Sequence, residues 1–332
     1  MTAAFRVDEL SVRIGRGQIL DTVSWSVEPG ETLGIVGESG SGKSMTVLSA
    51  TGLVPRPPAV VTGRALLGEP DGSASDLLTM TPAQLRSVRG RRIGFVFQDP
   101  STSLNPLLTV ERQLTEGLEQ HLGLRPEAAA KRAVELLEMV GIPDPARRVQ
   151  NFPHELSGGM RQRVMIAIAL SCDPEVLIAD EPTTALDVTI QAQILDIVRD
   201  LQQRLGTSVV WISHDLGVVG ALADRIVVLY GGQVVESADV ETLFKQRSHP
   251  YTQGLFAARP TLGRTGAELV TIPGSPPDPR ELPPGCVFYD RCELRLDHRC
   301  RTERPPLVEL DAEHWVRSFC ATGSAERAEV RR

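Results

Sequence analysis

The sequence predicts an α/β fold with an N-terminal antiparallel β region, a helical middle and a small C-terminal tail domain. Three observations support this prediction. Apolar strand patterns alternate with helical patterns over most of the chain, which is typical of a parallel sheet. A glycine-rich loop separates one such strand from a helix. Four of the five cysteines are crowded near the end of the chain.

The composition narrows the class of protein. A chain of 332 residues with 41% hydrophobic content has room for about two globular domains. The formal charge of -7 argues against broad electrostatic binding to nucleic acid. No apolar run approaches the roughly 18 residues that span a bilayer, and the start lacks the features of a secretory signal. We therefore expect the chain to stay in the cytoplasm and to reach a membrane only through a partner.

The N-terminal third reads as strands around a loop. Residues 5–28 alternate apolar and polar side chains about a turn at 15–17, as a hairpin would. An apolar burst at 32–37 then leads through glycines into a helix-compatible stretch from Lys43. A proline-rich break at 55–58 and a polar loop precede a short strand at 93–97.

The rest of the chain continues the alternation and then changes character. Helical spacing at 111–121 and 126–140 predicts a helical subdomain at about 100–165. Apolar strands at 176–180 and 208–213 flank a helix at about 189–205, and a hairpin turns at Gly231 and Gly232. Proline content then rises, and a separate tail begins near Phe244. The expected domains are 1–243 and 244–332.

The glycine-rich loop is the first site of chemistry. Its sequence GESGSGKS fits the phosphate-loop pattern of glycine, four residues, glycine, lysine, and serine or threonine. Its glycines let backbone N–H groups curl around phosphate oxygens at a helix N-terminus. The lysine is expected to reach the outer phosphates and the serine hydroxyl to hold magnesium. The candidate nucleotide-binding residues are Gly37, Glu38, Ser39, Gly40, Ser41, Gly42, Lys43 and Ser44.

Two acidic residues downstream suggest hydrolysis. Asp180 closes an apolar strand, so its carboxylate would emerge at the ligand-binding edge of the sheet and hold magnesium. Glu181 comes next and could polarise the water that attacks the outer phosphate, as the catalytic base. The alternatives are a chance glycine turn and a solvated acidic pair. The phosphate loop alone does not separate kinases, GTPases, helicases and transport ATPases.

A further segment names a family. The sequence LSGGMRQR at 156–163 places Ser157 as a helix cap before two glycines, an arrangement that binds anions. It resembles the LSGGQ signature of ABC ATPases, with Met160 in the glutamine position, a variant of the peptide-importer branch. This resemblance implies that Ser157, Gly158 and Gly159 contact ATP held by an opposite ATPase subunit.

Three more ABC elements follow in the family's order. In that family Gln98 would sense magnesium and the attacking water, Asp187 in the TALD sequence would couple two sites, and His214 would contact the outer phosphate. One family feature departs from the pattern. Ile14 stands where an aromatic ring usually stacks on adenine, which predicts weaker nucleotide binding unless Phe5 or another ring replaces it.

The resemblance extends to one branch of the family over nearly the whole chain. SHPYTQGL at 248–255, QDPSTSLNPLLTV from Gln98 and the cysteine tail resemble the ATP-hydrolysing subunits of oligopeptide or dipeptide importers. This implies two permease subunits, a second and non-identical ABC ATPase, an extracytoplasmic solute-binding protein, and a peripheral location at the cytoplasmic face of the cell membrane, without nucleic acid. The sequence alone assigns no chemistry to the HPYT element, which reads simply as a helix start after Pro250. A soluble ABC protein acting on ribosomes or DNA, a kinase, and nickel as cargo stay open.

The tail cysteines suggest a metal. They are Cys286, Cys292, Cys300 and Cys320, separated by five, seven and nineteen residues, a spacing that matches neither paired zinc ligands nor the common ferredoxin run. The resemblance of GCVFYDRC to the importer tail implies that these four residues hold a 4Fe-4S cluster. Zinc, or reduced cysteines packed in a small appendage, are the alternatives. Cys172 is expected to be a small core residue.

Overall fold

A computed structural model of the chain describes residues 3–69, 71–184, 186–258, 271–295 and 297–320. Its internal contacts divide the chain into two units. The first unit comprises Met1–Phe5, Ser26–Thr32 and Leu66–Ser213, and the second comprises Arg6–Trp25, Leu33–Ala65 and His214–Arg332. Each unit therefore combines segments that are distant in the sequence.

The first unit contains a parallel sheet. Strand β7 (Val176–Asp180) lies between β6 (Ile93–Val96) and β8 (Ser208–Ser213), and all three run in the same direction. Every residue of β7 and β8 is buried, as expected for strands covered on both faces. Parallel strands end at one edge of a sheet, so the residues that follow β6 and β7 meet there. The three strands predicted from the sequence are confirmed.

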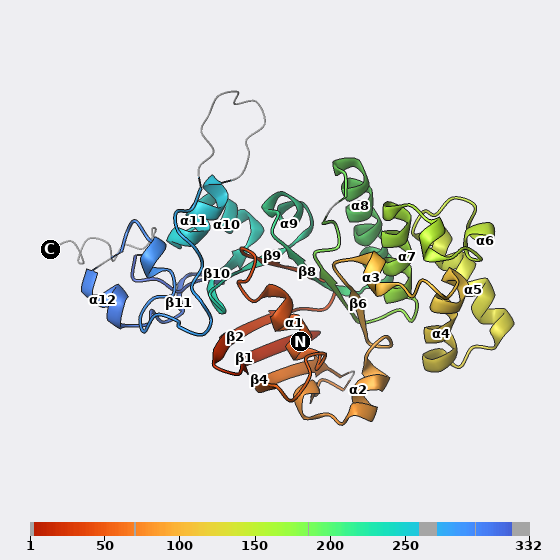
Figure 1. The fold of residues 1–332 in the computed structure, drawn as a ribbon, viewed down its shortest axis with the longest axis horizontal. Helices are drawn as coiled ribbons and strands as arrows, with labels where there is room; N and C mark the ends of the chain where they lie inside the picture. Colours follow the sequence, from red (N-terminus) through yellow and green to blue (C-terminus); the bar gives the residue numbers. More distant parts are fainter. Residues whose placement is uncertain (1–2, 70, 185, 259–270, 296, 321–332) are drawn as a thin grey trace. The chain divides into compact units, whose positions relative to one another are not determined.

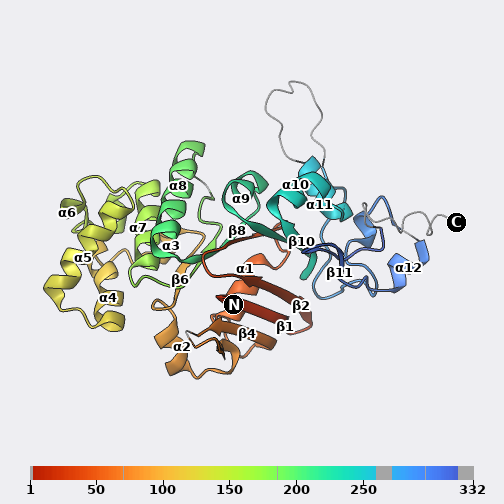
Figure 2. The ribbon, with the colours of Figure 1, turned by 180° about the vertical axis from the view of Figure 1, so that it is seen from behind.

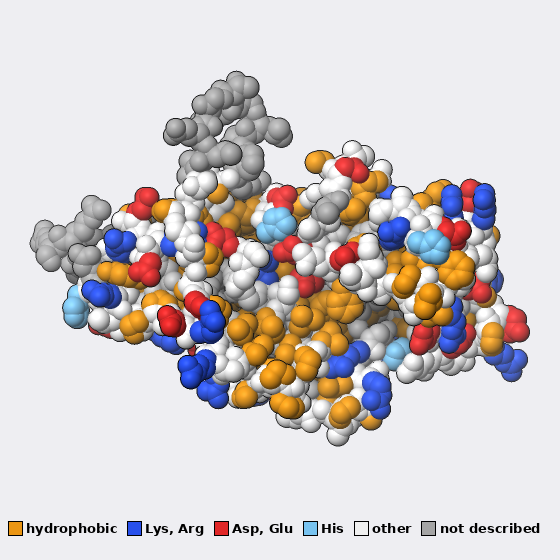
Figure 3. Space-filling view, viewed as in Figure 1, with side chains coloured by type: hydrophobic (Ala, Val, Ile, Leu, Met, Phe, Trp, Pro, Cys, Tyr) orange, Lys and Arg blue, Asp and Glu red, His pale blue; other side chains and the backbone are white. Residues whose placement is uncertain are grey.

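Helices make up most of the rest of the first unit. Helix α5 contacts α4, α6 and α7, and α4 also contacts α7, so these helices lie together in Figures 1 and 2. Charged side chains of both signs cover their outer surface at the right of Figure 3, while Leu114 and Leu118 of α4 are fully buried. No helix in the described ranges is long and apolar enough to cross a membrane. The further elements of this unit are β5 (Ala74–Asp76), η1 (Leu77–Thr79), α2 (Pro82–Val88), α3 (Pro100–Ser103), α4 (Val110–Leu122), α5 (Pro126–Met139), α6 (Pro145–Arg148), η2 (Pro153–Glu155), α7 (Gly158–Leu170) and α8 (Val188–Leu205).

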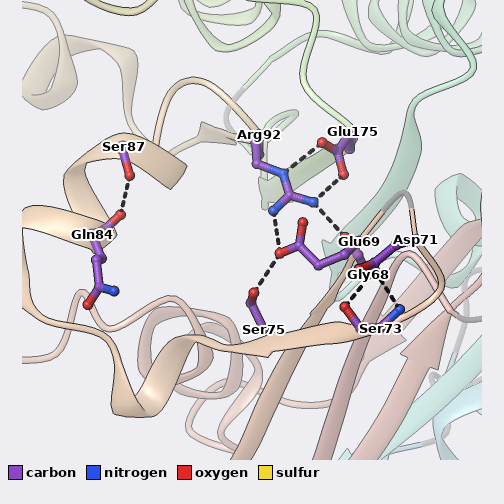
Figure 4. Close-up of polar contacts among 9 residues, drawn as sticks. All are labelled: Gly68, Glu69, Asp71, Ser73, Ser75, Gln84, Ser87, Arg92 and Glu175. Carbon is purple, nitrogen blue, oxygen red and sulfur yellow. Dashed lines mark hydrogen bonds and ion pairs between the residues drawn. The ribbon is translucent and has the colours of Figure 1, made fainter.

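An arginine network ties the β5 region to the parallel sheet (Figure 4). Arg92, just before β6, donates to both carboxylate oxygens of Glu175, at 2.7 and 2.9 Å. It also donates to Glu69 at 3.0 Å and to the carbonyl oxygen of Gly68 at 2.5 Å. Ser75 donates to the same Glu69 oxygen at 2.5 Å. One guanidinium thus joins residues that are far apart in the sequence.

The second unit has a mixed sheet. Its strand order is β11 (Val308–Asp311), β12 (His314–Val316), β10 (Gln233–Asp239), β9 (Arg225–Tyr230) and β3 (Thr32–Val36). Strands β3 and β9 are parallel, while β9 and β10 form the predicted antiparallel hairpin. Strand β12 adds antiparallel to β10, so the C-terminal part of the chain extends this sheet.

The second unit also contains the N-terminal hairpin. Strands β1 (Phe5–Ile14) and β2 (Gly17–Val27) are confirmed as predicted, and β4 (Ala59–Gly68) pairs beside β1. The sequence did not predict β4, because its exposed residues, including Val60, hide the alternation. The remaining helices are α1 (Lys43–Ala50), α9 (Leu216–Leu222), α10 (Val240–Gln246), α11 (Pro250–Ala257), η3 (Tyr289–Arg291) and α12 (Asp297–Thr302). Helix α10 crosses the predicted start of the tail.

Candidate active site

The predicted phosphate loop joins β3 to α1 in the second unit. Gly42 precedes α1 with φ of 103°, a conformation that only glycine adopts without strain. The Lys43 ammonium donates to the carbonyl oxygens of Gly37 at 2.9 Å and Glu38 at 3.1 Å, and the residue is 5% exposed. The lysine therefore folds back over the loop that it follows.

The loop has the features of an anion site. Helix α1 turns its N-terminus toward the loop, where the helix dipole favours negative charge. The hydroxyl of Ser41 is buried and has no hydrogen-bond partner among the described residues. A buried hydroxyl is costly without a partner, and a phosphate oxygen would supply one. The donor chemistry therefore fits a nucleotide phosphate.

The predicted catalytic residues meet at the carboxyl edge of the first unit's sheet. Asp180 ends β7 and is 6% exposed. Gln98, two residues beyond β6, donates through Nε2 to Oε2 of Glu181 at 3.2 Å. The Thr184 hydroxyl donates to the same oxygen at 3.0 Å. The edge therefore collects amide and carboxylate oxygens, which are the donors that magnesium prefers.

The backbone fixes the direction of Glu181. Its φ is 46°, in the left-handed region that a non-glycine residue adopts only when its surroundings hold it there. Its N–H donates to the carbonyl oxygen of Ile212 at 3.0 Å, which extends the pairing of β7 with β8 by one residue. Strain of this kind concentrates at functional positions.

The predicted signature segment begins α7 in the first unit. Ser157 caps this helix by accepting a hydrogen bond from the Met160 N–H at 3.3 Å, as predicted. Asp187 caps α8 in the same way, with 2.9 Å to the Ile190 N–H. A Cβ on Gly159 would lie 3.0 Å from Cγ2 of Ile190, so Gly159 lets the two helix starts approach closely. Gly158 is exposed beside it.

The predicted site residues thus form two groups. Gln98, Asp180, Glu181 and the two helix caps belong to the first unit, whereas residues 37–44 and His214 belong to the second. His214 is exposed directly after β8. Ile14 is half-buried, and Phe5 is fully buried. The Phe5 ring therefore lies in the core and does not replace the missing aromatic residue.

The tail cysteines line one pocket of the second unit, together with Phe288 and Phe319. The sulfur atoms of Cys300 and Cys320 are 3.7 Å apart. Burial raises the pKa of the Cys286 thiol to about 11, whereas a hydrogen bond with Cys320 lowers the pKa of Cys292. The thiols have the donor chemistry of a metal centre. Within the described ranges, however, no group of three or more His, Cys, Asp or Glu side chains is arranged to hold a metal ion.

Cys172 lies outside the tail, and two residues that the sequence did not predict contact the phosphate loop. Cys172 is 1% exposed, as expected of a core residue. Tyr251 and Arg291 both contact Glu38 of the phosphate loop. The sequence placed Tyr251 only in a family motif and gave Arg291 no role, because neither contact is local. The motif at 248–255 was the available signal.

Two family descriptions match the chain. The family described as "ABC transporter" matches residues 20–184. The family described as "Oligopeptide/dipeptide transporter, C-terminal region" matches residues 235–300. The two matches cover the phosphate loop, the β7 carboxylates, and much of the C-terminal part.

Curated proteins and solved structures agree with these matches. The oligopeptide transport ATP-binding protein OppD of Bacillus subtilis is 47% identical over 336 residues, covering 99% of this chain and 92% of that protein. A putative peptide import ATP-binding protein of Brucella abortus is 52% identical over 273 residues, covering 82% of this chain and 81% of its own. The ATP-binding cassette MJ0796, solved as a dimer in a post-hydrolysis state with ADP and Pi, has a TM-score of 0.62 at 29% identity, over 71% of this chain and 98% of its own.

Proposed function

The chain belongs to the family of ABC transporter ATP-binding proteins of oligopeptide import. On this basis we propose which of its residues bind ATP and which catalyse its hydrolysis. The chain is the ATP-hydrolysing subunit of a peptide importer. What needs assignment is the role of each group. The observation that carries the assignment is the Glu181 carboxylate, held by Gln98 and Thr184 at the end of β7.

The second unit binds the phosphates. The loop of residues 37–44 binds the phosphate oxygens through N–H groups that follow Glu38, whose own N–H donates to Tyr251, and Lys43 turns from its carbonyl partners to the outer phosphates. His214 contacts the outer phosphate and stabilises charge that develops there. Ser157, Gly158 and Gly159 contact ATP on an opposite ATPase subunit, because the capped start of α7 leaves N–H groups free for an anion.

The first unit supplies hydrolysis. Glu181 accepts a proton from the attacking water, while Gln98 and Thr184 keep its carboxylate in one orientation. Gln98 and Asp180 would hold magnesium, which when bound offsets charge on the phosphate oxygens, and the phosphate-loop pattern gives the hydroxyl of Ser44, in the second unit, the role of a magnesium ligand. Asp187 couples the sites of the two subunits, through the α8 start that touches Gly159.

A substitution of the base tests this division. Glu181→Gln keeps the size and the hydrogen bonds but cannot accept the proton, so kcat for ATP should fall by roughly 100- to 10,000-fold. The dissociation constant for ATP should stay within about twofold, because the charge removed acts on water. Asp200→Asn, an exposed change of the same kind on α8, is the control. Equal turnover in both variants would overturn the assignment of Glu181.

The assembly is proposed from the relatives. Two permease subunits, a second and non-identical ATPase, and an extracytoplasmic solute-binding protein complete the importer, with this chain at the cytoplasmic face of the cell membrane. ATP closes the ATPase pair and hydrolysis reopens it. The nucleotide-binding domain is 1–243 and the C-terminal domain is 244–332, with α10 crossing the boundary. Copurification of this chain with the permease subunits tests the proposal, and retention on ribosomes or DNA would contradict it.

We also propose that the four tail cysteines form one ligand set, for a 4Fe-4S cluster or, as the alternative, zinc. Their shared pocket supports this, as does the small core of the tail, since a metal can replace apolar burial in a small domain. Metal analysis after purification without oxygen decides between them. About four irons and four sulfides per chain indicate the cluster, and one zinc indicates zinc. Neither metal in protein that hydrolyses ATP would refute the ligand set.

A further inference from the structure

One residue of the phosphate loop is held by side chains from far along the chain. The N–H of Glu38 donates to the hydroxyl oxygen of Tyr251 at 2.8 Å, across a separation of 213 residues. The Glu38 carboxylate accepts two hydrogen bonds from the Arg291 guanidinium, at 2.6 and 3.0 Å, across 253 residues. All three residues belong to the second unit. The contact is a bidentate ion pair, which fixes orientation as well as distance.

Arg291 is itself held rigidly. Its side chain is 5% exposed, and its Nε donates to the carbonyl oxygen of Pro273 at 2.8 Å. Its two terminal nitrogens also donate to the Ile272 carbonyl and to the Tyr230 hydroxyl, both at 3.2 Å. The bond to Glu38 is the largest cause that raises the pKa of Arg291. The guanidinium therefore stays charged, and all five of its N–H donors are occupied.

Aromatic packing fixes the second contact. The rings of Tyr230 and Tyr251 have centroids 4.5 Å apart, and the Phe288 ring packs edge-on against both, at 5.1 and 5.5 Å. Tyr251 is fully buried, and burial raises the pKa of its hydroxyl, which therefore stays neutral. The Tyr251 oxygen thus presents a fixed acceptor to the Glu38 N–H.

These contacts restrain the loop on every polar side of Glu38. The Glu38 carbonyl oxygen accepts from Lys43, while its N–H and carboxylate are held by Tyr251 and Arg291. The phosphate loop binds through the directions of its N–H groups, so a small rotation at Glu38 would misdirect the donors that follow it. A loop already held in one conformation also loses less entropy on binding.

We propose that Arg291 and Tyr251 are positioning residues for ATP binding. The C-terminal region would then help to orient the phosphate loop of the nucleotide site. This inference rests on the proposed assignment of residues 37–44 to the ATP phosphates. It gives the HPYT element a physical role, because its tyrosine holds the loop. It also predicts that the C-terminal region and the nucleotide affect each other reciprocally, since coupling between sites acts in both directions.

A double-mutant cycle on the full chain tests the proposal. The variants are Arg291→Met, Glu38→Gln and the double variant. Arg291→Lys is a milder change that keeps the positive charge but cannot donate two parallel hydrogen bonds to the carboxylate. The dissociation constant is measured with a fluorescent ATP analogue, and unfolding midpoints are measured without nucleotide. Arg280→Met is the matched control, because Arg280 makes an exposed ion pair with Asp278 in the same region.

We expect a roughly tenfold weaker dissociation constant in Arg291→Met and Glu38→Gln, a smaller loss in Arg291→Lys, and no change in Arg280→Met. The double variant should bind about as weakly as either single variant, because both remove the same contact. If Arg291→Met fails to fold, Arg291→Lys and Glu38→Gln still decide the question. Lower unfolding midpoints with an unchanged dissociation constant would reduce the contact to a structural role and overturn the proposal. Normal binding by Lys43→Ala would instead overturn the phosphate site itself.

Discussion

The two units hold the proposed site residues by different means. In the first unit, Gln98, Asp180 and Glu181 lie at or just beyond the ends of strands that are direct neighbours in a parallel sheet. Their meeting point follows from topology alone, since parallel strands end at the same edge. In the second unit, the phosphate loop has a recognisable local sequence, but its Glu38 is oriented by Tyr251 and Arg291. A site built on strand ends is fixed by its sheet, whereas a site built on a loop needs distant support.

The largest expected effect is on ATP binding and comes from removing the charged Lys43 side chain of the phosphate loop. Lys43→Ala removes the ammonium that we propose turns to the outer phosphates, and the loss of one such charged group should weaken ATP binding by roughly 100-fold or more. Binding of an ATP analogue should show this loss, whereas Glu181→Gln should bind normally and fail to hydrolyse. Equal loss of binding in both variants would break the division between a binding unit and a hydrolysing unit.

The next largest effect should come from a buried carboxylate in the second unit. Glu236 is fully buried on β10 and accepts from the N–H groups of Ser248 at 2.6 Å and His249 at 3.0 Å, with Nε2 of His314 at 2.9 Å. It therefore ties α11 and β12 to the sheet. Glu236→Ala leaves these buried groups without their hydrogen-bond partner and should lower the free energy of unfolding by about 3 kcal/mol or more.

Urea unfolding of the full chain measures this loss, with Glu241→Ala as the control. Glu241 pairs with Lys245 on the surface of α10, where an ion pair contributes less than about 1 kcal/mol. Similar losses in the two variants would show that the buried acceptor is not what holds the C-terminal region to its sheet.

A smaller effect is expected at the corresponding network of the first unit. Arg92→Met breaks the bonds to Glu69 and Glu175 and should lower the free energy of unfolding by about 1 to 2 kcal/mol, because Glu175 is half exposed. Arg112→Met, at an exposed pair with Glu119, is the control. Similar losses in Arg92→Met and Glu236→Ala would mean that the two units depend equally on distant contacts.

The Arg92 contribution should also depend on pH. Hydrogen bonding from Ser75, followed by that from Arg92, lowers the pKa of Glu69 in the folded chain. A carboxyl with a lowered pKa stabilises the fold above its unfolded pKa, and this contribution is lost as the pH falls. The difference between wild type and Arg92→Met should therefore shrink below about pH 4. A difference that grows in acid would contradict the ion-pair account.

How much the sequence predicts follows the same division. The alternation of apolar residues predicted β7 and β8, and the position of Asp180 and Glu181 at a strand end predicted where they lie. Strand β4 was missed because the exposed stretch at 62–64 interrupts the alternation of buried side chains along the strand. The Glu38 contacts were missed because no local pattern records a partner more than 200 residues away. Periodicity reports burial, whereas pairing across the fold leaves no periodic signal.

The smallest expected effect comes from removing the single hydrogen bond between Tyr251 and Glu38. Tyr251→Phe keeps the ring and its packing on Tyr230 and Phe288 but leaves the Glu38 N–H without its acceptor. Loss of one neutral hydrogen bond costs about 1 kcal/mol, or roughly fivefold in a binding constant. The dissociation constant for an ATP analogue should therefore rise by up to about fivefold, less than in Arg291→Met, where a charged bidentate contact is lost. Tyr289→Phe is the control, because Tyr289 is a half-buried tyrosine of the same region, on η3, whose ring lies 5.5 Å from the Arg295 guanidinium. An equal effect of the two tyrosine changes would show that the loop responds to general loosening of the C-terminal region. A selective effect of Tyr251→Phe would show that one hydroxyl, supplied from α11, fixes the Glu38 backbone and thereby the direction of the N–H groups that follow it in the loop.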